Sequence, residues 1–233
     1  TQALVQRGYS VGCGYGSMKQ LQNQNRRVIF YNDSAYPPKA HEGRNSQGPF
    51  LADASESILK TMFENPLGSF TMIEGSQVDW AGHENDSAYL LAELADLDVT
   101  IQRVLAMAKD NKETLIVITA DHETGGLSLG AAGEYLWLPD VVRKVKATGR
   151  SIAGQLKQAD SDAAALAIWA ELTSINLTEA EQKTLLTTRQ QDETTLRKLS
   201  NQLVAKYSYT GWTTGGHTAA DVAVLAYGKD AKD

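Results

Sequence analysis

The chain has 233 residues and a formal net charge of −6, with 42% apolar and 21% charged residues. This composition is close to the globular average and excludes an intrinsically disordered chain. An acidic chain without a basic block is a poor nucleic-acid binder, and no apolar run approaches the roughly 18 residues that a transmembrane helix needs. With Cys13 as its one cysteine, the chain cannot form an internal disulfide or a cysteine-based zinc finger.

Four short runs of β-forming apolar residues predict strands, and we expect them to be covered on both faces. They are Val28–Tyr31, Phe70–Ile73, Leu115–Thr119 and Val222–Tyr227.

Helical patterns lie between these runs. Apolar residues at helical spacing predict a long helix over Ser87–Lys109. Asp53, with Glu56 three residues on, predicts the cap of a helix over Ser57–Asn65. The alternation of strands and helices favours an α/β fold with a mostly parallel sheet flanked by helices.

The pattern changes after about residue 130. No convincing strand follows until residue 207, glycine is absent between Gly154 and Gly211, and Thr178 with Glu181 has the spacing of a capping box. We therefore predict an α-helical insertion over residues 131–207. Residues 1–130 and 208–233 would form the α/β core.

The end of the second predicted strand carries the first group of candidate metal ligands. Glu74 follows the strand, and Asp79 and His83 are four residues apart. One helical turn would place the last two on the same face, where a carboxylate and an imidazole suit zinc. The alternative is an acidic loop with a surface histidine, because this spacing alone is common.

Two further segments hold candidate ligands. Asp121 and His122 follow the third predicted strand directly, and Gly125 and Gly126 allow the chain to turn there. His217 lies in a Gly/Thr-rich loop and gains meaning only as a ligand that completes the other groups. Three imidazoles with carboxylates suit zinc, and an extra carboxylate suits magnesium. We assign no role to the fourth histidine, His41, which we expect in a solvated loop.

Three segments, in this order and spacing, resemble the metal-site signature of bacterial alkaline phosphatases. They are Glu74-Gly75…Asp79-Trp80…His83, Thr119-Ala120-Asp121-His122 and Gly216-His217-Thr218. The similar stretches run from about residue 51 to 130 and from 213 to 228.

The resemblance implies a two-zinc and magnesium site in an alkaline-phosphatase-like fold. Asp79, His83 and His217 would hold one zinc, Asp121 and His122 the second, and Glu74 the magnesium. Trp80 would shape the phosphate pocket, although simple packing is an equal alternative. The reaction implied is hydrolysis of small phosphate monoesters through a phosphoserine.

The resemblance also implies that the nucleophilic serine lies in an Asp-Ser-Ala segment far upstream of these motifs. Asp33-Ser34-Ala35 has this composition, but an irregular segment follows it, so we do not assign Ser34 as the nucleophile. The chain thus resembles the C-terminal part of an alkaline phosphatase. We expect weak or no turnover from this chain alone.

Two alternatives remain open from the sequence. A phosphodiesterase or phosphomutase of the same superfamily shares the Asp-His at a strand end, and a non-catalytic module would keep the ligands without the chemistry. By the same resemblance, residues 131–207 lie where family members carry insertions that often cover the active site or form dimer contacts. A solvated helical subdomain is the preferred interpretation of this region, and a homodimer is also open. The resemblance implies a periplasmic or extracellular location.

Overall fold

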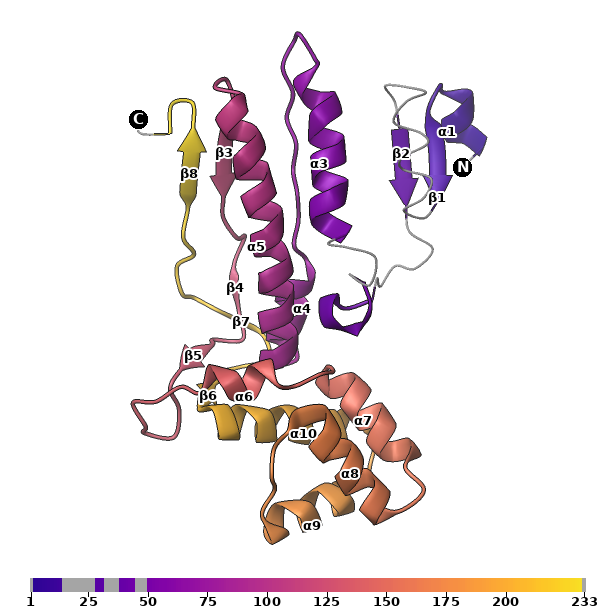
Figure 1. Ribbon diagram of the computed structural model, residues 1–233, viewed down its shortest axis with the longest axis vertical. Coiled ribbons are helices and arrows are strands. Elements are labelled where there is room, and N and C mark those ends of the chain that lie inside the picture. Colours follow the sequence, from indigo (N-terminus) through magenta and orange to yellow (C-terminus); the bar gives the residue numbers. More distant parts are fainter. Residues whose placement is uncertain (1, 14–27, 32–37, 45–49, 232–233) are drawn as a thin grey trace.

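The computed structural model describes residues 2–13, 28–31, 38–44 and 50–231. Two long helices, α3 (Phe50–Phe63) and α5 (Ser87–Asp110), lie side by side and form its axis (Figure 1). A group of shorter helices gathers at one end of α5, and small two-stranded sheets flank the long helices.

Helix α5 confirms the prediction for Ser87–Lys109. It begins where the side chain of Asp86 accepts a hydrogen bond from the backbone N–H of Tyr89, which satisfies one of the free donors of the first turn. Burial raises the pKa of Asp86, against hydrogen bonds from Gly149 and Tyr89 that act to lower it.

Helix α3 begins earlier than predicted. It starts at Phe50, so Asp53 is inside the first turn, and Ser57 is in the middle of the helix rather than at its start. The Asp53 carboxylate instead forms an ion pair with Arg103 of α5, which also contacts Glu56 at 3.2 Å. An acid in the first helical turn is favourable in either position, so the sequence signal located the helix but not its first residue.

The described strands form four two-stranded sheets. Strand β1 (Ser10–Cys13) pairs in parallel with β2 (Val28–Tyr31), and β3 (Leu115–Ile118) pairs antiparallel with β8 (Leu225–Gly228). The two remaining pairs are antiparallel and two residues long. Strand β4 (Glu123–Thr124) pairs with β7 (His217–Thr218), and β5 (Ser128–Leu129) pairs with β6 (Thr210–Gly211). Parallel pairing is therefore present in one ladder of the described residues.

Two expectations about strands are wrong. Phe70–Ile73 forms no strand, and Phe70 and Met72 are 90% and 80% exposed. Strand β3 forms, yet Leu115 and Val117 are exposed on one of its faces. A β-forming run needs a neighbouring strand, and the described residues supply none to Phe70–Ile73 and a single one to β3.

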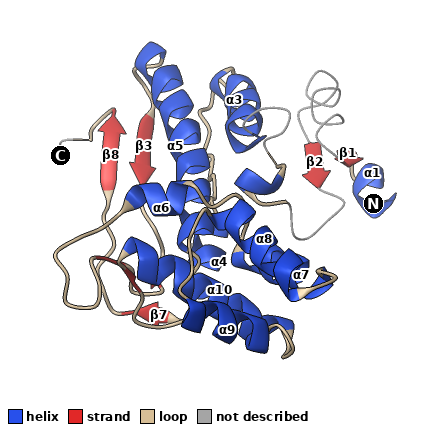
Figure 2. Ribbon diagram, turned by 60° about the horizontal axis from the view of Figure 1, so that its bottom comes forward, coloured by secondary structure: helices blue, strands red, loops and turns tan. Residues whose placement is uncertain are grey.

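Five helices lie within residues 139–208, whereas residues 131–138, which belong to the predicted helical insertion, form turns and irregular chain. Thr178 and Glu181 form the capping box at the start of α9. The main apolar core lies among these helices, around Trp169, and also includes Ala88 at the start of α5. That shared core fixes the helical group to the α5 end that holds the candidate site (Figure 2). The helices are α6 (Pro139–Arg143), α7 (Gly149–Gln158), α8 (Asp162–Thr173), α9 (Glu179–Thr188) and α10 (Glu193–Ser208).

Short elements complete the described chain. They are α1 (Gln2–Gln6), η1 (Ala40–Glu42), α4 (Gln77–His83), β4 (Glu123–Thr124), β5 (Ser128–Leu129), β6 (Thr210–Gly211) and β7 (His217–Thr218). In the described ranges, every helix is too short or too polar to cross a lipid bilayer.

Candidate metal centre

Helix α4 presents the first two ligands. Asp79 and His83 lie one turn apart, and Nε2 of His83 is 3.5 Å from Oδ1 of Asp79. This confirms that the four-residue spacing places both side chains on the same helix face.

His217 reaches these residues through a short ladder rather than a loop. Strand β7 pairs with β4, so that His217 lies opposite Thr124 and Thr218 opposite Glu123. The Glu123 carboxylate accepts hydrogen bonds from the Thr218 hydroxyl and, at 2.8 Å, from the backbone N–H of Gly126. The bond from Thr218 lowers the pKa of Glu123 and holds β7 against β4, whereas the bond from Gly126 lies within the turn that follows β4.

Two glycines allow α4 and β4 to approach closely. A Cβ at Gly82 would lie 2.8 Å from the carbonyl oxygen of Thr124, and one at Gly125 would lie 2.6 Å from the Trp212 ring. Gly125 also has a φ of +92°, which residues with a Cβ rarely adopt. The two glycines thus set how closely α4 lies against β4.

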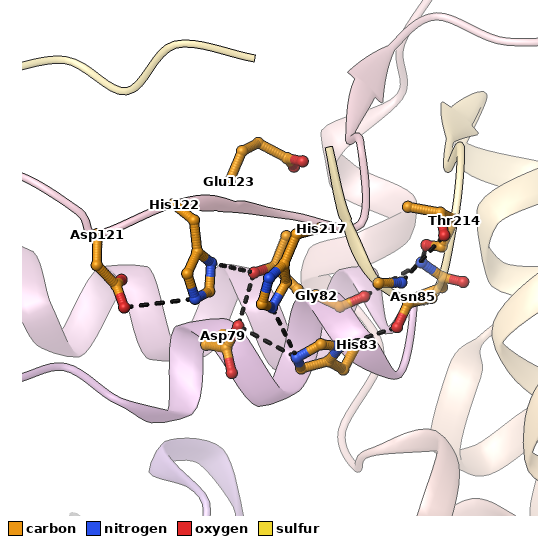
Figure 3. A network of polar contacts seen from close by, with 12 residues as sticks. Asp79, Gly82, His83, Asn85, Asp121, His122, Glu123, Thr214 and His217 are labelled. Atoms are coloured by element: carbon orange, nitrogen blue, oxygen red, sulfur yellow. Dashed lines mark hydrogen bonds and ion pairs between the residues drawn. The ribbon is translucent and has the colours of Figure 1, made fainter. Parts of the chain in front are cut away.

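The three side chains converge on one point (Figure 3). Asp79, His83 and His217 each offer a ligand atom, and these atoms all lie within 4.8 Å of one another. Nε2 of His217 is 3.4 Å from Nε2 of His83. Nδ1 of His83 donates to the carbonyl oxygen of Gly215 at 2.8 Å, which leaves the lone pair of Nε2 directed at the cluster.

Two of the three ligand separations in this cluster are close to those around a tetrahedral ion. Bonds of about 2.1 Å at tetrahedral angles place ligand atoms about 3.4 Å apart, whereas an octahedral ion of the same bond length places neighbours about 3.0 Å apart. The separations of 3.4 Å between the two imidazoles and 3.5 Å between His83 and Asp79 match the tetrahedral value. Two nitrogens and one oxygen also form a donor set that suits zinc.

The second pair of candidate ligands, Asp121 and His122, lies against the first group. The His122 ring stacks on the His217 ring with centroids 3.6 Å apart, and Nε2 of His122 is 3.3 Å from Oδ2 of Asp121. Both residues follow the end of β3, as the sequence predicts. The Asp121 side chain is 88% exposed, so this pair is open to solvent on one side.

Thr124 connects the two groups, and no sequence pattern indicated it. Its hydroxyl donates to Oδ1 of Asp79 at 2.6 Å and accepts from Nδ1 of His122 at 3.2 Å. A proton on Nδ1 leaves Nε2 of His122 free as a ligand on the side of Asp121. One hydroxyl thereby orients a ligand of each group.

The alkaline phosphatase family model matches residues 7–233. The chain belongs to the alkaline phosphatase family. It is 34% identical to alkaline phosphatase 3 of Bacillus subtilis over 210 residues, which cover 89% of this chain and 45% of that protein. The chain therefore spans about half the length of this curated relative.

Solved alkaline phosphatases share its fold. A cold-active alkaline phosphatase from a psychrophilic Shewanella species superposes with a TM-score of 0.82 at 29% identity, over 99% of this chain and 57% of that chain. A mutant of the TAB5 alkaline phosphatase, with Mg bound in a site named M3, has a TM-score of 0.56 at 25% identity, over 97% and 47% of the two chains. The expected alkaline-phosphatase-like α/β fold is confirmed.

The remaining predicted site residues, Glu74 and Trp80, lie outside the two groups of candidate ligands. Glu74 is exposed at the end of an irregular segment and is not part of the three-ligand cluster in the described ranges. Trp80 lines a cavity beside the cluster. Ser34 lies outside the described residues.

His41 is not in a solvated position, so that expectation is wrong. Both of its ring nitrogens are buried and have no hydrogen-bond partner among the described residues. The cause is the packing of η1 between α5 and the start of α7, where Glu42 accepts from the backbone N–H of Thr148 at 2.7 Å.

Proposed function

We propose that this chain carries the metal-binding part of a phosphate monoester hydrolase. The convergence of Asp79, His83 and His217 on one point is the observation that supports the proposal most strongly. Family membership makes phosphate esters the expected substrate class.

Each ligand has a proposed role. Asp79, His83 and His217 hold one zinc ion, Asp121 and His122 contribute to a second, and Glu74 contributes to a magnesium site. Bound there, the zinc ions would supply Lewis-acid stabilisation of the charge that develops on phosphoryl oxygens. Gly215 and Thr124 keep the imidazoles in the tautomers that binding requires.

The nucleophile of this proposal is a serine that forms a phosphoserine. We expect it upstream of the metal motifs and do not assign it to Ser34. The chain alone should then show weak or no turnover, because ligands around a metal do not replace a nucleophile. We also propose export from the cytoplasm as the location.

Metal content tests the site directly. Protein purified without chelator should contain about one zinc ion or more per chain by plasma mass spectrometry, and zinc should raise the melting temperature by mass action. Asp79→Asn and His217→Ala should each lose the tightly bound ion. Asp140→Asn, at the exposed start of α6, is the control and should keep it. Zinc retained by both site variants would contradict the proposed ligand set.

The substrate class is tested on the full-length parent. We expect it to hydrolyse p-nitrophenyl phosphate far faster than bis(p-nitrophenyl) phosphate. The opposite ratio would favour the phosphodiesterase reading, and tight zinc binding with no hydrolysis of either ester would favour a non-catalytic module.

A further inference from the structure

A cavity of about 530 Å³ lies on the neighbouring face of the helix that carries the metal ligands. Trp80 directly follows Asp79, and Glu84 directly follows His83. One residue along a helix turns the side chain by about 100°, so the cavity and the metal cluster occupy adjacent faces of α4. The cavity is lined by Lys39, Trp80, Glu84, Tyr89 and Arg150.

Lys39 is held over two aromatic rings at this cavity. Its Nζ lies 5.6 Å from the centroid of the Trp80 ring and 5.3 Å from that of Tyr89. Both distances are within the range of a cation–π contact, and no carboxylate of the described residues forms an ion pair with this amine. The ammonium group is therefore positioned by ring faces and keeps its hydrogen-bond donors for a ligand.

The lining carries a net positive charge. Its charged residues are Lys39, Arg150 and Glu84, so two cations face one carboxylate, in a chain whose net charge is −6. Glu84 contacts Arg150 at 2.7 Å and, outside the lining, Arg197 at 3.0 Å. A local positive region in an acidic protein attracts anions to that region.

The segment that carries Lys39 is fixed to the helices beneath it. The backbone N–H of Ala40 donates to Oε1 of Glu93 at 2.9 Å, and Arg44 forms ion pairs with Glu93 and Asp96. Burial acts to lower the pKa of Arg44, but the hydrogen bonds that it donates to Glu93 and Asp96, together with their negative charge, outweigh burial and raise this pKa. A fixed cation binds an anion without first losing conformational freedom.

The start of α7 fixes the opposite side of the cavity. The backbone N–H of Gly149 donates to Oδ2 of Asp86 at 2.6 Å, which places Arg150 beside α4. A Cβ at Gly149 would lie 1.8 Å from Oδ1 of Asn201, so only glycine allows this approach. The cavity is thus built by contacts that are independent of the metal ligands.

We propose that this cavity is an anion subsite that binds a second negatively charged group on the alcohol part of the substrate. Its preferred substrates would be phosphate esters whose alcohol carries a further phosphate or carboxylate. The reacting phosphate would lie at the metal cluster and the second anion at Lys39 and Arg150. The subsite itself needs no bound metal, whereas its role in substrate selection rests on the proposed phosphatase function.

Binding of inorganic phosphate to the EDTA-treated chain tests the subsite without turnover. Phosphate should shift the indole N–H resonance of Trp80, and Lys39→Gln should weaken that binding about tenfold, the value of one charge-assisted contact. Lys39→Arg keeps the charge and should retain most of the affinity. Lys183→Gln, an exposed lysine of α9, removes the same charge away from the cavity and should have no effect. Equal weakening by Lys39→Gln and Lys183→Gln, or no shift at Trp80, would overturn the proposal.

The full-length parent separates free phosphate from a substrate group. We expect kcat/KM for fructose 1,6-bisphosphate relative to glycerol 2-phosphate to fall about tenfold in Lys39→Gln. An unchanged ratio would overturn substrate selection by the subsite. A parent that binds phosphate at Trp80 but hydrolyses neither ester would contradict the proposed function and leave the anion subsite standing.

Discussion

The candidate metal ligands depend on neighbouring residues that are not ligands themselves. His83 is oriented by a backbone carbonyl at Gly215, and that loop is held in turn by Asn85, whose amide donates to the carbonyl oxygen of Thr214 at 2.7 Å. Thr124 orients Asp79 and His122 together. Outer hydrogen bonds of this kind fix ring orientation and increase ligand basicity, so their loss weakens metal binding even though every ligand remains.

Thr124→Val tests this at a single hydroxyl. Valine keeps the shape of threonine but removes the donor to Asp79 and the acceptor for His122, so zinc affinity should fall roughly 10- to 100-fold. Competition with a fluorescent zinc chelator would measure the affinity.

Thr184→Val provides the matched control. This threonine is in α9, and its hydroxyl bonds to the carbonyl oxygen of Ala180, within the same helix. We expect unchanged zinc affinity from it. An equal, small effect of the two variants would show that Thr124 does not orient the ligands.

Individual residues also show which parts of the candidate site the sequence patterns could predict. Asp79 and His83 were found because the helical period is a local property, and Asp121 and His122 because they end an apolar run. Thr124 and Gly215 were missed because their roles arise only when β4, β7 and α4 meet in space. His41 was misplaced for the same reason, since its burial comes from α5 and α7, far away in the sequence.

At the scale of elements, the site depends on how closely α4 lies against β4. Gly82→Ala should separate them, because its Cβ would lie 2.8 Å from the carbonyl oxygen of Thr124 and 3.0 Å from the Thr124 Cβ. We expect a destabilisation of roughly 1–3 kcal/mol and weaker zinc binding. Urea unfolding and a zinc titration would measure the two effects.

Gly154→Ala is the control for Gly82→Ala, because it adds the same methyl group at a position with free space. Gly154 is inside α7, and nothing lies within 4 Å of its added Cβ. Alanine should stabilise this helix by up to about 1 kcal/mol and leave zinc binding unchanged. If Gly82→Ala were equally harmless, the close approach of α4 and β4 would not matter for the site.

The contact of α9 with α10 predicts a pH dependence in the helical group. Glu181 accepts hydrogen bonds from Lys206 at 2.6 Å and from the Tyr207 hydroxyl at 2.7 Å, and these lower its pKa to about 2. Because the folded pKa is below the unfolded one, the stabilisation is complete above the ordinary carboxyl pKa. It is lost as the pH falls towards 2.

Glu181→Gln should therefore lower the melting temperature most at neutral pH, and the difference from the wild type should vanish near pH 2. Thermal unfolding followed by circular dichroism from pH 7 to 2 would show this. Glu179→Gln, an exposed change of the same charge two residues away, should have a much smaller effect. A difference for Glu181→Gln that persists at pH 2 would contradict the linkage argument.

The whole molecule shows why helices were predicted better than the sheet. The long helix α5 and the helices of residues 139–208 make their hydrogen bonds within themselves, so local periodicity and capping residues suffice. A strand needs a partner elsewhere in the chain. Phe70–Ile73 has the composition of a strand and no described partner, and three of the four described ladders are antiparallel although alternation with helices favours parallel pairing.

The segment before α4 exposes several large apolar side chains. Leu67, Phe70 and Met72 are 94%, 90% and 80% exposed. Monomeric proteins seldom expose apolar groups so close together, because water favours their burial against another surface. We therefore expect the isolated chain to self-associate through this segment at micromolar concentration and above.

Replacing Phe70 and Met72 together by serine should reduce that association. Both side chains are almost fully exposed, so the stability of the folded chain should change by no more than about 0.5 kcal/mol per site. Sedimentation velocity over a concentration series would measure association, and urea unfolding would measure stability. Val5→Ser, an exposed apolar residue of α1, is the control and should leave association unchanged. A wild-type chain that remains monomeric would contradict association through Phe70 and Met72. A loss of several kcal/mol in the free energy of unfolding on substitution would show that these side chains are covered in solution.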